Sequence, residues 1–177
     1  MTKEVVFSGF GGQGVLTAGY MFAEMLLMTD YNLTYMPAYG AEMRGGTANC
    51  TVKYDKGRIG SPLMKNINIL VAMNGPAAEA FEKLVVPGGY MLVNSDIVDK
   101  TEYRNDITVV NIPFNSLAKE TGNARAANLV MLGSVVKYSD ITDIGTAVEV
   151  VRAYFSDKGK EQYNDINEKA LRRGFDY

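Results

Sequence analysis

The sequence is poor in the side chains that most often carry redox or acid–base chemistry. Its 177 residues include one cysteine, Cys50, and neither histidine nor tryptophan. An iron–sulfur cluster needs about four thiolates and a structural zinc ion about four Cys or His ligands, so this chain alone can build neither. Histidine catalysis and nucleophilic sites of the Cys–His or Ser–His kind are excluded as well. Any redox centre connected with this protein must therefore lie on another chain, and Cys50 itself is expected to be a small buried apolar residue.

Long hydrophobic runs and an excess of basic charge are also missing. No apolar run approaches the roughly 18 residues of a membrane span, and the segment Met1-Thr2-Lys3-Glu4 lacks the apolar core of a signal peptide. The net charge is −2 and the sequence pI is about 5.2, which gives no basic surface of the kind that follows a nucleic-acid backbone. We therefore expect a cytoplasmic protein with neither a membrane nor a nucleic acid as partner.

Glycines are concentrated near the N-terminus, in the segment Ser8-Gly-Phe-Gly-Gly-Gln-Gly14. The segment follows the apolar run Val5-Val6-Phe7 and precedes a helical pattern, so Gly9, Gly11 and Gly14 satisfy G-x-G-x-x-G at a strand-to-helix turn. Such a loop can place an anion on the N-terminus of the following helix. The same glycines can instead serve only tight helix–strand packing.

A dinucleotide site also needs an acidic residue at the end of the second strand, roughly 20 residues after the glycines, to hold a ribose hydroxyl. Here the segment Leu33-Thr34-Tyr35-Met36 continues into Pro37 without a carboxylate, and Asp30 precedes the strand. A stand-alone nucleotide-binding protein or NAD-dependent dehydrogenase is therefore the weaker alternative.

Strand and helix patterns alternate along residues 1–177 without a linker, which predicts one domain. Strands are expected over about 3–8, 32–37, 47–54, 67–73, 90–94 and 107–113, and helices over about 14–28, from Pro76, and over about 115–120, 125–137, 143–155 and 161–172. Residues 58–61 are expected to pair with 47–54 as a hairpin across the turn Asp55-Lys56-Gly57. The prediction is a three-layer α/β/α Rossmann-like domain with a mostly parallel sheet and a β-hairpin insertion.

A second glycine-rich segment is Tyr39-Gly40-Ala41-Glu42-Met43-Arg44-Gly45-Gly46. Glu42 and Arg44 are two residues apart, and the flanking glycines allow backbone conformations in which both side chains face one partner. The segment can bind an anion or dock a protein, or it can be an ordinary surface turn with solvated charges.

Together, these two segments, Ser61-Pro62 and the spacing of Asn128 and Gly133 strongly resemble the gamma subunit of the 2-oxoacid:ferredoxin oxidoreductases. The same module is a domain of single-chain pyruvate:ferredoxin oxidoreductase. The resemblance covers nearly the whole chain in order and spacing. A general interaction module without a ligand is a third hypothesis, because ten methionines and eleven tyrosines offer an adaptable contact surface.

The resemblance implies a complex that oxidatively decarboxylates a 2-oxoacid with coenzyme A and passes electrons to ferredoxin. In that family, thiamine diphosphate lies between other subunits, alpha and beta, and iron–sulfur clusters are held by a cysteine-rich delta subunit or domain. This chain is then a structural part that is inactive alone, has no catalytic residue and holds no metal, and helps to form the coenzyme A site. The substrate stays open among 2-oxoglutarate, pyruvate, branched-chain 2-oxoacids and indolepyruvate.

The resemblance also implies which residues matter. We expect a cofactor-binding loop formed by Gly9, Gly11, Gly12, Gln13 and Gly14. We expect a subunit interface formed by Tyr39, Gly40, Glu42, Arg44, Gly45 and Gly46. Asn128 is expected to support a loop, and Gly133 to allow close helix packing.

Overall fold

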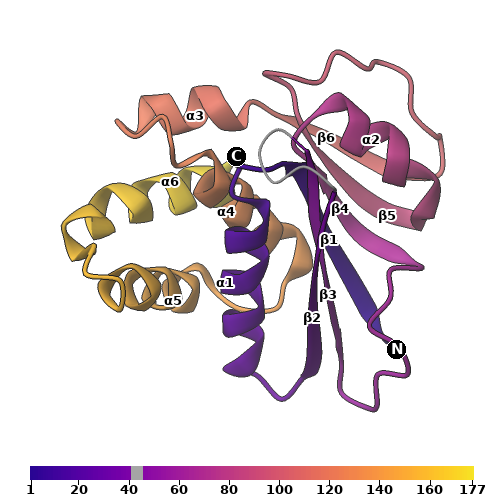
Figure 1. Cartoon of the computed structure of the whole chain (residues 1–177), viewed down its shortest axis with the longest axis horizontal. Coiled ribbons are helices and arrows are strands. Elements are labelled where there is room, and N and C mark those ends of the chain that lie inside the picture. The colour runs from indigo at the N-terminus through magenta and orange to yellow at the C-terminus, as the bar shows by residue number, and fades with distance from the viewer. Residues whose placement is uncertain (41–45) are drawn as a thin grey trace.

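The protein is built on a mixed sheet of six strands in the order β2-β3-β1-β4-β5-β6 (Figure 1). The computed structural model describes residues 1–40 and 46–177. Strands β1, β4, β5 and β6 are parallel neighbours, whereas β3 is antiparallel to both β1 and β2. The strands are β1 (Lys3–Phe10), β2 (Asn32–Tyr39), β3 (Thr47–Asp55), β4 (Ile67–Ala72), β5 (Val85–Asn94) and β6 (Thr108–Ile112).

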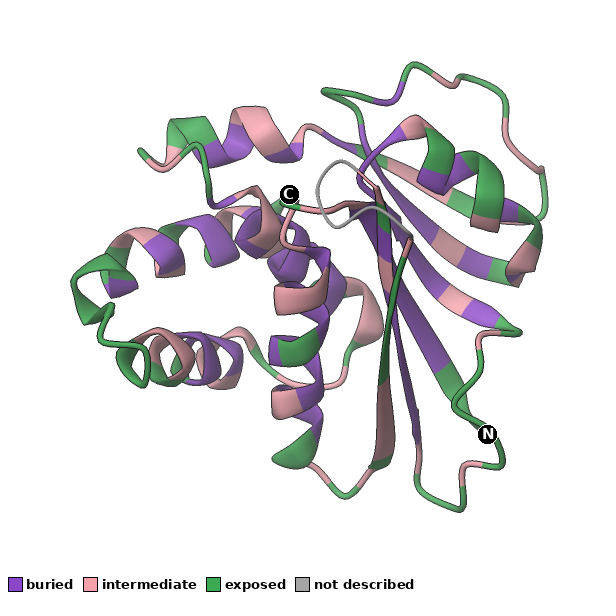
Figure 2. Ribbon diagram, in the orientation of Figure 1, coloured by how far each residue is buried: buried purple, intermediate pink, exposed green. Residues whose placement is uncertain are grey.

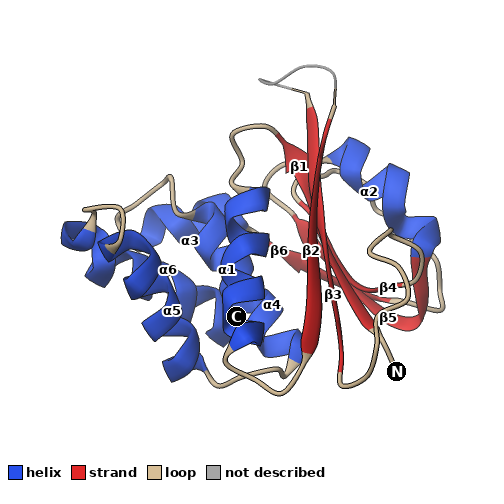
Figure 3. Ribbon diagram, turned by 60° about the horizontal axis from the view of Figure 1, so that its bottom comes forward, coloured by secondary structure: helices blue, strands red, loops and turns tan. Residues whose placement is uncertain are grey.

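Helices cover both faces of the sheet (Figures 1 and 3). Helix α2 lies on one face, and the other helices are gathered on the opposite side. The helices are α1 (Val15–Leu27), α2 (Gly75–Phe81), α3 (Phe114–Glu120), α4 (Ala127–Ser139), α5 (Ile144–Ser156) and α6 (Asn164–Asp176), with short 3-10 turns η1 (Glu82–Leu84) and η2 (Glu161–Tyr163). The α/β architecture predicted from the alternating pattern is confirmed.

The alternation of side chains along the central strands divides the apolar core between the two faces. On β1, Val5 and Phe7 face the cluster formed with α1 and α4, whereas Val6 faces the cluster under α2. All three side chains are fully buried. Because β1 and β4 are buried on both faces, their sequences are nearly continuous apolar runs.

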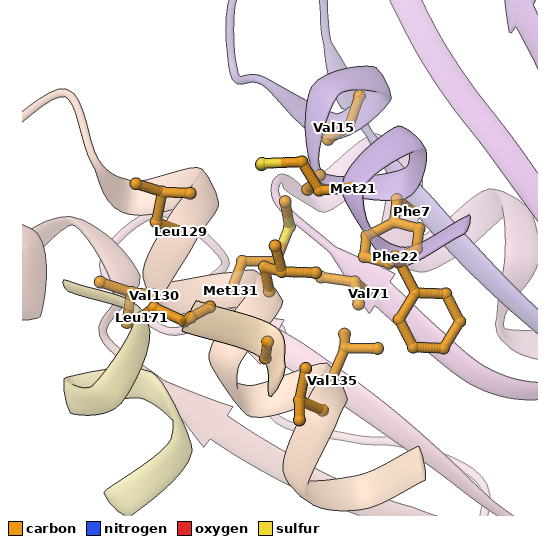
Figure 4. Close-up of a cluster of buried hydrophobic side chains, with 14 of the residues drawn as sticks. Phe7, Val15, Met21, Phe22, Val71, Leu129, Val130, Met131, Val135 and Leu171 are labelled. Atoms are coloured by element: carbon orange, nitrogen blue, oxygen red, sulfur yellow. The ribbon is translucent and has the colours of Figure 1, made fainter. Parts of the chain in front are cut away.

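Helix α4 lies in the middle of the larger cluster, between β4, α1 and α6. Val130 of α4 lies beside Leu171 of α6, whereas Met131 of α4 extends toward Val71 and Phe22 (Figure 4). The same cluster contains Cys50, which is fully buried, as predicted.

The prediction that residues 58–61 pair with 47–54 as a β-hairpin is wrong, because residues 58–61 form no strand. The backbone amide of Gly57 does donate to Oδ1 of Asp55 at 2.9 Å, so the chain turns there as expected. However, β3 already has β2 on one edge and β1 on the other, which leaves no free edge for a third partner. The antiparallel part of the sheet is made instead by β3 between β1 and β2.

Strand β2 forms one edge of the sheet and is largely accessible to solvent, in contrast to the buried central strands (Figure 2). Pro37 lies on this strand and lacks the N–H that a further strand would need. Within the described ranges, none of the helices is long and apolar enough to cross a membrane.

Candidate functional site

The glycine loop joins the end of β1 to the start of α1. Gly12 and Gly14 have backbone φ angles of 99° and 73°, in the left-handed region that disfavours other residues. Gly14 is also the N-cap of α1, where it provides no side-chain cap. The first intrahelical bond runs from the amide of Ala18 to the carbonyl of Gly14 at 3.0 Å. The N–H groups of the first turn of α1, at residues 15–17, therefore have no partner within the helix and are available to a ligand.

The side chain of Gln13 holds this loop against the end of β4 through hydrogen bonds. Its Oε1 accepts hydrogen bonds from the amide of Phe10 at 2.7 Å and from Nδ2 of Asn74 at 3.1 Å. Its Nε2 donates to the carbonyl of Met73 at 3.2 Å. A Cβ at Gly9 would lie 2.5 Å from Oε1 of Gln13 and 2.9 Å from Cβ of Met73. Gly9 is thus required by this arrangement, and both ends of the Gln13 amide are engaged within the protein.

Asn128 of α4 packs against the other end of the loop. A Cβ at Gly14 would lie 2.7 Å from Cβ of Asn128 and 2.8 Å from its Cγ. The start of α4 can therefore approach the start of α1 only because residue 14 has no side chain. The sequence singled out both residues, but it did not reveal that they are in contact.

The two glycine-rich segments meet in the structure. The amide of Gly11 donates to the carbonyl of Gly46 at 2.9 Å, and the amide of Gly40 donates to the carbonyl of Thr47 at 2.7 Å. Tyr39, at the end of β2, is 69% exposed. Of the expected interface residues, Tyr39, Gly40 and Gly46 are thus placed beside the loop, whereas Glu42, Arg44 and Gly45 lie outside the described residues.

A pocket of about 350 Å³ lies where these segments meet. Its walls come from the glycine loop, the first turn of α1 and the facing ends of β2 and β3. The lining residues are Phe10, Gly11, Gly12, Gly14, Val15, Leu16, Thr17, Tyr39, Gly46, Thr47 and Ala48. Backbone amides and the N-terminus of a helix favour anions, and no described lining residue carries a charge. This arrangement suits binding of an anionic group rather than acid–base catalysis.

The thiol of Cys50 is unsuited to chemistry, because burial raises its pKa to about 12. Its Sγ donates to the carbonyl of Val15 at 3.5 Å, and a Cβ at Gly19 of α1 would overlap it. No group of His, Cys, Asp and Glu in the part of the chain that the structure describes is arranged to hold a metal ion.

Two asparagines at the carboxyl edge of the sheet were not anticipated. Asn74 caps α2 by accepting from the amide of Ala77 at 2.9 Å and also bonds Gln13. Asn94, at the end of β5, is fully buried and donates to Oδ1 of Asn115 at 3.0 Å. Their position directly after buried strands is the signal that could have indicated them, because polar residues at carboxyl ends of parallel strands collect at one edge.

The sheet, the helices on both faces and the glycine loop at the first strand-to-helix turn define a Rossmann-like α/β protein. Its sheet has an antiparallel edge formed by β2 and β3. Its residues 4–177 match the family described as pyruvate ferredoxin/flavodoxin oxidoreductase. The chain belongs to this family, as the resemblance predicted.

Individual relatives agree with this assignment. The chain is 38% identical over 175 residues to the ketoisovalerate oxidoreductase subunit VorA of Methanothermobacter marburgensis, an alignment that covers 98% of this chain and 36% of that protein. It thus spans about a third of the length of the VorA relatives it matches. It is 32% identical over 144 residues to the 2-oxoglutarate synthase subunit KorC of Methanocaldococcus jannaschii, covering 80% of this chain and 77% of KorC.

A solved structure shows the same fold over nearly the full length of both chains. The crystal structure of the keto/oxoacid ferredoxin oxidoreductase gamma subunit from Geobacter sulfurreducens PCA aligns with a TM-score of 0.86 and 27% sequence identity. The alignment covers 99% of this chain and 95% of the gamma subunit.

Proposed function

We propose that this chain is the gamma-type subunit of a 2-oxoacid:ferredoxin oxidoreductase. The complex oxidatively decarboxylates a 2-oxoacid with coenzyme A, forms an acyl-CoA and reduces ferredoxin. The observation that carries the proposal is the end-to-end match to a protein described as a gamma subunit, which the chain covers by 95%. The VorA and KorC relatives support the same class of enzyme and leave the choice between a branched-chain 2-oxoacid and 2-oxoglutarate open.

The partners are alpha and beta subunits that bind thiamine diphosphate, an iron–sulfur subunit or domain, and ferredoxin as electron acceptor. The scarcity of ligands in this chain supports this division of labour, because its one thiol is buried and it has no histidine. We place the complex in the cytoplasm, where a single reduced cysteine is the usual state.

Within the complex, the pocket at the glycine loop contributes to the coenzyme A site. Coenzyme A carries several phosphate groups, and the open first turn of α1 offers N–H donors and a positive dipole end. Gly12 supports this role, because no atom of the described residues lies within 4 Å of where its Cβ would be. The loop thus has room for a ligand at this position.

The second segment forms the contact with the thiamine-binding subunits. Tyr39 supports this role, because a tyrosine with 69% exposure at the end of an edge strand is suited to a subunit interface. Gly40, Glu42, Arg44, Gly45 and Gly46 are assigned to the same contact on the family resemblance.

The assembled complex tests the coenzyme A role through a matched pair of variants. Gly12→Leu and Gly88→Leu both place a side chain at a positive φ, 99° and 76°, where no described residue lies within 4 Å of the new Cβ. Gly88 lies at the start of β5, away from the pocket. Viologen reduction by the reconstituted complex should show a KM for coenzyme A at least tenfold higher for Gly12→Leu, with Gly88→Leu within twofold of wild type. Equal KM values for both variants would show that the loop does not contribute to the site.

The subunit assignment is tested separately by assembly. The chain alone should be colourless and should not reduce viologen with any 2-oxoacid, coenzyme A and thiamine diphosphate. Arg44→Ala should weaken co-purification with the thiamine-binding subunits, whereas Arg58→Ala, an exposed control, should not. Turnover by the verified isolated chain would contradict the assignment.

A further inference from the structure

A groove of about 380 Å³ lies between α1 and α5, on the side of the sheet that carries most of the helices (Figure 3). The two helices pack beside each other, and side chains from both form its walls. The lining residues are Tyr20, Glu24, Leu27, Met28, Glu149, Val150, Ala153, Tyr154 and Asp157. None of them lines the glycine-loop pocket, so the groove is a separate feature of the surface.

The lining residues follow the helical period on both helices. Tyr20, Glu24 and Leu27 are four and three residues apart along α1, which places them on one stripe of that helix. On the other wall, Glu149 of α5 and the C-cap residue Asp157 lie on a stripe of the same kind, eight residues apart. The groove thus extends over about two turns of each helix, a length that suits another helix.

Apolar side chains in the groove are accessible to solvent. Leu27 and Met28, at the end of α1, are 64% and 60% exposed, and Tyr20 is 43% exposed. Val150 of α5, at 9% exposure, adds a mostly buried apolar side chain to the lining. Covering such residues removes apolar area from water, and adjacent exposed apolar residues bordered by polar ones mark interaction surfaces.

The charged residues of the groove are acidic. Glu24, Glu149 and Asp157 line it, and no Lys or Arg is among its described lining residues. None of the three carboxylates forms an ion pair with another described residue. The Glu24 carboxylate, as a hydrogen-bond acceptor and as a negative charge, raises the pKa of the Tyr20 hydroxyl. A partner that covers the apolar residues must therefore bring positive charge, because a neutral one would leave the carboxylates desolvated and unpaired.

We propose that the groove between α1 and α5 docks an amphipathic helix of a partner protein, one whose apolar stripe is flanked by Lys or Arg side chains. The apolar stripe covers Leu27 and Met28. The basic side chains pair with Glu24, Glu149 and Asp157. This inference goes beyond the proposed function and does not depend on it, because it concerns a surface of the chain outside the glycine-loop pocket.

Fluorescence anisotropy of the full chain with labelled peptides of about 18 residues tests the proposal. The probe peptide carries Leu at helical spacing and Lys elsewhere, so that it forms a basic amphipathic helix. It should bind at least tenfold more tightly than two control peptides. The first control has Glu in place of every Lys, and the second has the composition of the probe arranged without an apolar face.

Each control excludes a simpler explanation of binding. Equal affinity for the Glu peptide would show that apolar contact alone is responsible. Equal affinity for the rearranged peptide would show a general attraction between opposite charges. Either result, or no binding of the probe peptide, would overturn the proposal.

Two double variants with the same change in net charge locate the acidic part of the site. Glu24→Lys combined with Glu149→Lys should weaken binding of the probe peptide at least tenfold. Glu79→Lys combined with Glu102→Lys should change it by less than threefold, because both residues are exposed and neither lines the groove. Equal weakening in the two double variants would place the peptide elsewhere and contradict the proposal.

A matched pair of leucine variants locates the apolar part. Leu27 and Leu63 are 64% and 60% exposed, and only Leu27 lines the groove. Leu27→Gln should weaken binding of the probe peptide at least fivefold, and Leu63→Gln by less than twofold. Because both side chains are exposed, both variants are expected to fold, which circular dichroism verifies. Unchanged affinity in Leu27→Gln would contradict the proposal.

Peptide binding and the coenzyme A test separate the two proposals. A chain that binds no probe peptide, in a complex whose KM for coenzyme A responds to Gly12→Leu, would overturn only the docking groove. The reverse result would overturn only the coenzyme A role of the glycine loop.

Discussion

Gly133 of α4 lies directly against the backbone of Leu171 of α6. A Cβ at Gly133 would overlap the carbonyl oxygen of Leu171 and lie 2.9 Å from its carbonyl carbon. Gly174 makes the reciprocal approach to the carbonyl of Val130, and Oγ of Ser134 donates to the carbonyl of Gly174 at 2.9 Å. The close helix packing predicted for Gly133 is confirmed.

Gly133→Ala should therefore force α4 and α6 apart and lower the free energy of unfolding by about 1–3 kcal/mol. Urea denaturation of the purified chain measures the loss. Gly60→Ala is the matched control, because in the part of the chain that the structure describes no atom lies within 4 Å of where its Cβ would be. Equal stability of the two variants would show that the α4–α6 contact relaxes without cost.

The ion pair between Glu4 and Lys53 joins β1 to β3 at 3.1 Å, and the two side chains are 4% and 8% exposed. Glu4 also accepts from the amide of Lys65 at 2.8 Å, and Lys53 also donates to the carbonyl of Leu63. Lys53→Met leaves the Glu4 carboxylate buried without its cation, and the loss of stability should be about 3–5 kcal/mol. Lys3→Met, at an exposed position of β1, should change it by less than about 0.5 kcal/mol. Chemical denaturation measures the free energy of unfolding of both variants. Equal values for Lys53→Met and Lys3→Met would show that the ion pair is dispensable for stability.

Gln13→Glu should disturb the glycine loop without changing its size. The substitution replaces the amide that donates to the carbonyl of Met73 with an acceptor, so two oxygens face each other at about the observed distance of 3.2 Å. The expected loss is about 1–3 kcal/mol, with faster hydrogen exchange at the amide of Phe10. Gln162→Glu, at an exposed position, serves as control. The same loss of stability in both variants would contradict the role of the Gln13 hydrogen bonds in holding the loop.

High pH should destabilise the chain through groups that are buried in their neutral forms. Burial raises the pKa of the Cys50 thiol to about 12 and that of the Tyr54 hydroxyl to about 12. Since unfolded cysteine has a pKa of about 8.5, the unfolded state loses its proton first. The stabilisation is complete below the unfolded pKa and is lost as pH rises through the folded value.

The free energy of unfolding is therefore expected to fall from about pH 8.5 upward. In Cys50→Ala the free energy of unfolding should decline less steeply with pH, because Tyr54 still contributes to the decline but the thiol no longer does. Labelling of Cys50 by a thiol reagent at pH 8 should be slow in the native chain and fast in denaturant. Rapid native labelling would show that the thiol is accessible.

Much of the fold could be predicted, because strands buried on both faces leave nearly continuous apolar runs. The run at residues 67–73 indicated β4, and the helical spacing from Val15 to Leu26 indicated α1. The glycine loop was also placed correctly, because it lies between an apolar run typical of a strand and a segment with helical spacing. Strand β5 begins earlier than expected, because the turn residues Pro87 and Gly88 lie within the strand as an irregularity.

The position of β3 could not be predicted, because hydrophobic patterns specify strands but not which strands pair. The contact of Gly14 with Asn128 depends on how helices far apart in sequence pack together. No local pattern contains this information. Glu42 and Arg44 remain predictions, because they lie outside the described residues.

Helices α1 and α2 leave two adjacent parallel strands, β1 and β4, toward opposite faces of the sheet. In open α/β sheets this divergence leaves a crevice at the carboxyl ends of the strands, where dinucleotides usually enter. Here the side chains of Gln13 and Asn74 span that crevice with a hydrogen bond of 3.1 Å. These two side chains thus occupy the usual entrance, and the pocket at the glycine loop lies instead between the first turn of α1 and the facing ends of β2 and β3.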